Sequence, residues 1–125
     1  MEYLEIKTNE DAGKLQILSN GMHDGYIISA EYRADPIDIY DYTKKSLILK
    51  VLVTSVEDLT IELCFDNVYD YRINDSVSSY GIQQFSVFFD EHKNTVFIDD
   101  LYTTDFKDVP LMTYVVAGRL RWRML

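Results

Sequence analysis

Hydrophobic and polar residues alternate along most of the chain after residue 25, and this two-residue period is typical of β-strands. The alternation is cleanest over residues 59–66, where we expect Ile61, Leu63 and Phe65 to face inward. The most apolar run, residues 46–54, predicts a central strand. The same period predicts further strands over residues 26–33, 68–73, 80–89, 95–102 and 111–124.

The N-terminal part of the chain follows a different pattern. Residues 2–7 suit a short edge strand, and a helix should begin at Thr8, because Thr8 and Asp11 match a weak form of the capping box. Asn20 and Gly21 tolerate left-handed backbone and are expected to end the helix. The helix should lay one apolar stripe on the sheet, formed by Leu15, Leu18 and Met22.

These elements together predict the fold class. Short connections between successive strands favour hairpins, and a single helix leaves too few crossovers for a parallel α/β sheet. We expect a mainly β (α+β) protein with about seven or eight strands, forming an antiparallel sheet that curls or a two-layer sandwich, with one short N-terminal helix. The chain has 125 residues, 47% of them hydrophobic, and no linker-like tract, so residues 1–125 are predicted to form a single domain.

Strict alternation also assigns side chains to the faces of the two longest strands. In the first, one face is expected to carry Tyr26, Ile28, Ala30 and Tyr32. In the last, one face is expected to carry Tyr114, Val116, Gly118, Leu120, Trp122 and Met124.

The opposite face of the last strand carries three arginines, Arg119, Arg121 and Arg123, spaced about 7 Å apart. They would repel one another unless acids on neighbouring strands answer them. One interpretation is a cross-strand ion ladder, with acids available at Glu31, Glu62, Asp70 and Asp100. The other is a strip that binds an anion or a partner.

The formal net charge of −9 bears on the partners. Nucleic acids and anionic membranes are polyanions that an acidic surface repels, so we expect neither, whereas a basic protein partner fits the charge. The sequence has no signal peptide and no apolar run of membrane-spanning length, which predicts a cytoplasmic protein. Cys64 is the only cysteine and His23 and His92 are far apart, so no disulfide, metal site or cofactor is expected.

His23 and Asp24 form the most chemically suggestive pair, within a corner bracketed by Gly21 and Gly25. A histidine oriented by a carboxylate can act as a general base, so a small hydrolase is one interpretation. No other histidine lies near in the sequence, and nucleophile elbows, phosphate loops and dinucleotide fingerprints are absent. The other interpretation is architectural: the pair fixes a sharp turn through hydrogen bonds between side chains and backbone. We favour it and expect no enzyme.

Acids and tyrosines interleave where the first long strand ends. The residues are Tyr32, Asp35, Asp38, Tyr40, Asp41 and Tyr42. Their carboxylates could hold calcium, but the segment lacks the glycine and the terminal glutamate of an EF-hand loop. Aromatic anchors surrounded by steering carboxylates are typical of a binding site for a basic protein partner. The alternative is that the tyrosines merely cover the edge of the sheet.

Two stretches carry a resemblance to a known group of proteins: residues 22–27, which open a strand, and residues 59–68. Together with the late apolar strand, they make the chain resemble small, acidic, β-rich bacterial proteins, several of which are grouped with the immunity proteins of polymorphic toxin systems. The resemblance implies a non-enzymatic inhibitor that binds its cognate toxin, with no catalytic residues. The alternatives are a small hydrolase using His23 and Asp24, and a structural subunit that self-associates through an edge strand.

Overall fold

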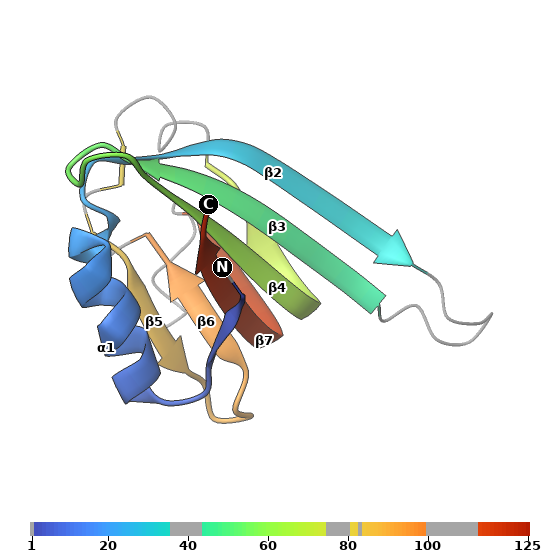
Figure 1. The fold of residues 1–125 in the computed structure, drawn as a ribbon. Helices are drawn as coiled ribbons and strands as arrows, with labels where there is room; N and C mark the ends of the chain where they lie inside the picture. Colours follow the sequence, from blue (N-terminus) through green and yellow to red (C-terminus); the bar gives the residue numbers. More distant parts are fainter. Residues whose placement is uncertain (1, 36–43, 75–80, 83, 100–112) are drawn as a thin grey trace.

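A computed structural model describes residues 2–35, 44–74, 81–82, 84–99 and 113–125. It confirms a mainly β fold: of the described residues 60% are in strands and 14% are helical, and their seven strands form one antiparallel, unclosed sheet (Figure 1). The strand order is β2-β3-β4-β7-β6-β5, and β1 pairs with β7. The elements are β1 (Leu4–Ile6), α1 (Asn9–Leu18), the 3-10 turn η1 (Asn20–Met22), β2 (Gly25–Asp35), β3 (Lys44–Val53), β4 (Leu59–Arg72), β5 (Ser86–Phe89), β6 (Thr95–Ile98) and β7 (Tyr114–Met124).

The N-terminal helix begins as predicted. The Thr8 side chain accepts a hydrogen bond from the Asp11 amide at 3.2 Å, and the Asp11 carboxylate accepts one from the Thr8 amide at 3.0 Å, which completes a capping box. Leu15 and Met22 are fully buried, but Leu18 is 40% exposed, so its predicted place in the apolar stripe is wrong. The buried side of α1 runs through Ala12 and Leu15 to Ser19, and Met22 reaches the core through left-handed backbone over Asn20–Met22 rather than by the helical period.

Alternate side chains of the long central strands fill the core, and we call the face of the sheet that carries them the core face. The inward face predicted for β4 is confirmed, and alternate residues of the central strand β3 are buried on the same face. The residues are Leu47, Leu49, Val51, Val53, Ile61, Leu63 and Phe65. The helix α1 contributes Ala12 and Leu15 to the same core from beside β5 (Figure 1). The far ends of β2, β3 and β4 extend beyond this helix.

A β-bulge changes the face assignments in β2. Ile27 pairs with Val51 and Ser29 pairs with Lys50, so Ile28 is an extra residue without a partner on β3. Each residue after Ile28 is therefore shifted by one position. Tyr32 pairs with the buried Leu47 and shares its face, whereas Tyr26 pairs with Leu52 on the opposite face, which we call the outer face. The prediction that Tyr26 and Tyr32 share a face is wrong.

The pairing of β4 with β7 is irregular at Asn67 and Gly118. Asn67 has a φ of 54°, and a Cβ at position 118 would lie only 3.2 Å from the Asn67 Cβ, so the two strands approach too closely there for a larger residue. Both strands change face at this point. Leu120 lies in the main core, whereas Val116 packs in a separate outer cluster with Val96 and Ile98. The prediction of one continuous face from Tyr114 to Met124 is wrong for this reason.

The last strands are shorter than predicted. β5 begins at Ser86 rather than residue 80, because the Phe85 amide donates to the Gly21 carbonyl at the helix corner instead of joining the sheet. β6 covers Thr95–Ile98, and β7 begins at Tyr114. Phe85 is buried and Val87 and Phe89 pack against the same core, as their alternation predicts.

Candidate functional site

Two tyrosines stack on each other near the ends of β2 and β4 that extend beyond α1. The ring centroids of Tyr32 and Tyr71 are 5.1 Å apart with an interplanar angle of 28°. Tyr32 comes from β2 and Tyr71 from β4, with β3 between them. Tyr71 pairs with the buried Val115, so both rings lie on the core face. Tyr32 is 41% exposed and Tyr71 is 37% exposed, so the stack forms part of the surface.

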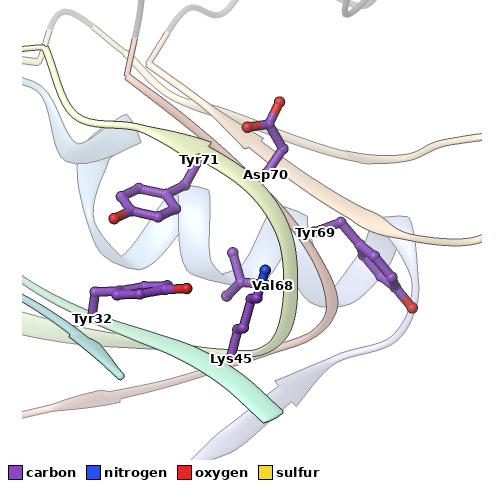
Figure 2. Close-up of a pocket in the computed structure, with 6 residues that line it drawn as sticks. All are labelled: Tyr32, Lys45, Val68, Tyr69, Asp70 and Tyr71. Carbon is purple, nitrogen blue, oxygen red and sulfur yellow. The ribbon is translucent and has the colours of Figure 1, made fainter. Parts of the chain in front are cut away.

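The stack borders a hollow of about 140 Å³ (Figure 2). Its lining residues, which we call the tyrosine site, are Tyr32, Lys45, Val68, Tyr69, Asp70 and Tyr71. Figure 2 shows the rings of Tyr32 and Tyr71 facing each other, with Val68 and Lys45 between Tyr32 and Tyr69. Tyr69 has no partner on β7, because the pairing passes from Val68 to Asp70, and this bulge leaves Tyr69 67% exposed.

The charges of the tyrosine site balance. Lys45 supplies one positive charge and Asp70 one negative charge. The Asp70 carboxylate points away from the stacked rings (Figure 2) and accepts a hydrogen bond from the Tyr114 hydroxyl at 3.0 Å. Burial, and next this hydrogen bond, raise the pKa of Tyr114. The described part of the site is therefore aromatic and amphipathic rather than acidic.

Only part of the predicted acidic and tyrosine-rich segment belongs to the described residues. Tyr32 is in the tyrosine site, and Asp35 ends β2 opposite Lys44. The other four predicted residues, Asp38, Tyr40, Asp41 and Tyr42, lie outside the described residues. The sequence prediction missed Tyr69 and Tyr71, although two tyrosines at alternate positions in the polar end of a strand were a signal that could have identified them.

The three arginines of β7 form a cross-strand ion ladder on the outer face, as one interpretation predicts. The pairs of this ladder are Arg119 with Glu5, Arg121 with Asp66 and Arg123 with Glu62. Glu62 was an expected partner. Asp66 and Glu5 take the place of the expected Glu31 and Asp70, and the expected Asp100 lies outside the described residues. Asp66 on β4 is opposite Arg119 and Glu5 on β1 is opposite Arg121, so each acid pairs with the arginine diagonally across from it.

Tyr3 covers two rungs of this ladder. The guanidinium carbons of Arg121 and Arg123 lie 4.8 Å and 4.5 Å from the centre of the Tyr3 ring, and the Tyr3 hydroxyl donates to Glu62 at 2.6 Å. Burial, and next the bond to the Glu62 carboxylate, raise the pKa of Tyr3 to about 12. Burial alone would raise the pKa of Glu62, but the hydrogen bonds from Tyr3 and Arg123 outweigh it and lower that pKa.

Cys64 lies under the same ladder. It is 6% exposed, and its sulfur accepts a hydrogen bond from the Arg121 guanidinium at 3.3 Å. Burial, and next the charge of Asp66, raise the pKa of the Cys64 thiol, which lowers the fraction of reactive thiolate. The geometry agrees with a structural thiol rather than a nucleophile.

His23 and Asp24 lie at the corner between η1 and β2, where their ring and carboxylate are 3.6 Å apart and about half exposed. Their backbone carbonyls anchor the corner to the segment that follows β3. The Ser55 hydroxyl donates to the His23 carbonyl at 2.6 Å, and the Thr54 hydroxyl donates to the Asp24 carbonyl at 2.8 Å. Asp24 also takes left-handed backbone, with a φ of 57°. Ser55 and Thr54 therefore help to hold this corner in place.

A second hollow, of about 560 Å³, lies beside α1. It is lined by Gly13, Gln16, Ile17, Asn20, Gly21 and Gln84, and neither His23 nor Asp24 lines either hollow. Within the described ranges, no three or more His, Cys, Asp or Glu side chains are placed to hold a metal ion. In the same part of the chain, no helix has the length and apolar character needed to cross a membrane.

Comparisons with known proteins give no indication of the function. No protein-family model, curated protein or solved structure matches the chain. We therefore infer the function from the geometry of the tyrosine site and of the ion ladder.

Proposed function

We propose that the chain is a non-enzymatic protein-binding module, an immunity-type inhibitor that binds a basic protein partner through the tyrosine site and the segment that follows Tyr32. The observation that carries the proposal is the stack of Tyr32 on Tyr71, which is exposed and lies beyond the cover of α1. Tyr69, 67% exposed, adds a third ring beside it.

Tyrosines suit a protein-binding site because each provides a large, amphipathic contact area and has few rotatable bonds to fix on binding. The stacked pair is already ordered in the free chain by its own ring contact, so binding costs less side-chain entropy. The hydroxyls of Tyr32 and Tyr71 have no hydrogen-bond partner within the described part of the chain and are available to a ligand.

Charge supplies the preference for a basic partner. The net charge of −9 steers a positively charged protein toward the surface and accelerates its association. Because Lys45 and Asp70 balance each other in the described site, we assign the local attraction to Asp35, Asp38 and Asp41, which follow Tyr32 in the sequence.

The test begins with purification of the tagged chain from its native cell and identification of the bound protein by mass spectrometry. With that partner in hand, Tyr32→Ala and Tyr71→Ala should each raise the dissociation constant about tenfold or more, as expected for central aromatic anchors. Tyr26→Ala is the matched control, because Tyr26 lies on the same strand but pairs on the outer face.

A double charge reversal at Asp38 and Asp41 should slow association, and added salt should weaken the complex. A complex that is insensitive to salt and unaffected by this reversal would contradict the basic partner. Binding that survives both tyrosine substitutions would contradict the tyrosine site.

A further inference from the structure

The strand β2 forms one end of the sheet and is unusually open. It bonds to β3 along one edge, and along the other edge the described residues give only one bridge, between Gly25 and Ile82 at the start of the strand. Figure 1 shows β2 as the outermost of the long strands β2, β3 and β4, which extend beyond α1. Backbone amide and carbonyl groups along such an edge are a template for pairing with another strand.

The side chains of β2 are exposed on both faces as well as at its edge. Every residue from Ile28 to Ala34 is exposed, including Ile28 at 56% and Tyr32 at 41%. Lysine and proline, which commonly protect edge strands, are absent from Gly25–Asp35. The bulge at Ile28 disturbs only the first part of the strand, so residues 29–35 keep a regular edge.

We propose that β2 pairs antiparallel with β2 of a second copy of this chain, about a two-fold axis that passes between the two copies of Tyr32. An antiparallel pair of identical strands requires an axis perpendicular to the sheet, and side-chain alternation then requires each register to be centred on a residue. The candidate registers within the regular part of β2 are therefore few. Pairing uses the free edge of both copies and closes the assembly as a dimer.

The charges of β2 favour a register centred on Tyr32 over the two neighbouring registers, centred on Glu31 and on Arg33. A centre at Tyr32 places Glu31 of each copy opposite Arg33 of the other, giving two favourable cross-strand pairs, and it places Ala30 opposite Ala34. A centre at Glu31 would instead oppose the two Glu31 side chains. A centre at Arg33 would oppose the two Arg33 side chains and bring Glu31 against Asp35. Both neighbouring registers are therefore disfavoured by like charges.

The dimer also extends the tyrosine site. The two Tyr32 rings would lie side by side on the core face, each stacked on its own Tyr71, so that four tyrosines form one row across the axis. The dimer does not depend on the proposed function, because a chain that inhibits nothing could still pair in this way. Each copy carries a charge of −9, so the two copies repel each other at long range, and the test should be made at about 0.15 M salt or above, where the Debye length is about 8 Å or shorter.

Disulfide trapping tests the register directly. In a Cys64→Ser background, Tyr32→Cys should form a crosslinked dimer under mild oxidation, because directly opposite Cα atoms in antiparallel strands lie about 4.5–5.5 Å apart, within disulfide range. Ala30→Cys alone should not crosslink, since the two copies of residue 30 would be displaced by about 13 Å along the strands. Ala30→Cys mixed with Ala34→Cys should give the crosslinked heterodimer.

Sedimentation measurements test the charges that select the register. Glu31→Arg and Arg33→Glu should each raise the dimer dissociation constant about tenfold or more, and mixing the two variants should restore a dimer near wild-type strength. Glu91→Arg, in a distant turn and at an 87% exposed side chain, is the matched control and should leave the dimer intact. A wild-type chain that sediments as a monomer up to roughly 1 mM would overturn the proposal. So would a dimer that crosslinks equally well through Ala30→Cys alone.

Discussion

Tyr3 and Tyr32 are tyrosines placed on opposite faces of the same sheet, and their surroundings differ in every respect. The Tyr3 ring contacts two guanidiniums and its hydroxyl is bonded to a buried carboxylate, Glu62. The Tyr32 ring contacts another tyrosine, and within the described residues its hydroxyl has no hydrogen-bond partner. The Tyr3 side chain is held by contacts within the chain, and the Tyr32 side chain is exposed to solvent.

Under the proposed function, one residue type serves stability on one face and recognition on the other. Around Tyr3, each polar group has a partner of the same chain, so removing one group leaves another uncompensated. The Tyr32 side chain is 41% exposed, so removing it should cost little folding free energy but would remove contacts that a partner could use. Substitutions on the two faces should therefore separate stability from binding.

The largest effect on stability is expected for Glu62→Ala. The change leaves the Tyr3 hydroxyl and the Arg123 guanidinium without their shared acceptor, and it should lower the free energy of unfolding by about 2–3 kcal/mol. Denaturant titration followed by circular dichroism measures it. Glu91→Ala, at an exposed turn, should change stability by less than about 0.5 kcal/mol. Equal, small effects of both substitutions would contradict the structural part assigned to the Tyr3 cluster.

The next largest effect is expected for Tyr3→Phe, which keeps the ring against the arginines and removes only the hydroxyl. Loss of one hydrogen bond to a charged acceptor should cost about 1–2 kcal/mol. Tyr69→Phe is the control, because Tyr69 is 67% exposed and should change stability by less than about 0.5 kcal/mol. If Tyr3→Phe is as stable as the wild type, the hydroxyl contributes nothing to the fold.

A related effect should appear at high pH. The pKa of Tyr3 is raised from 10.0 in the unfolded reference to about 12 in the fold, so its stabilisation is fully present below pH 10 and is lost as the pH rises through about 12. The free energy of unfolding should fall over this window more steeply in the wild type than in Tyr3→Phe. Tyr114, whose pKa is also raised, should keep part of the decline in both proteins. Identical alkaline slopes would contradict the environment described for Tyr3.

The inward faces of the central strands could be predicted from the sequence because hydrophobicity decides them. Ile61, Leu63 and Phe65 of β4 alternate with more polar residues, and only one assignment places all three on the core face. The face changes at Ile28 and at Gly118 could not be predicted in this way. A bulge depends on the fit between two strands, and a one-residue shift leaves no mark on the composition of either strand.

The same limit explains what was predictable of the candidate site. Tyr32 was identified because acids and tyrosines gather after it in the sequence. Its stack on Tyr71 was not, since the contact spans β3 and requires the Ile28 bulge to place Tyr32 on the core face. On β4, the irregularities at Asn67 and Tyr69 cancel, and Tyr71 returns to the face that Phe65 occupies. Each step is a property of pairing rather than of local sequence.

The smallest effect on stability is expected at the tyrosine site itself. Tyr71→Ala removes a stacked pair at the surface, and the free energy of unfolding should fall by no more than about 0.5–1.5 kcal/mol. Tyr32→Ala together with Tyr71→Ala should cost less than the sum of the two single changes, because both remove the same contact. A loss for Tyr71→Ala as large as that for Glu62→Ala would make the stack a structural element like the Tyr3 cluster. A small loss of stability combined with a large loss of partner binding would instead assign the core-face tyrosines to recognition.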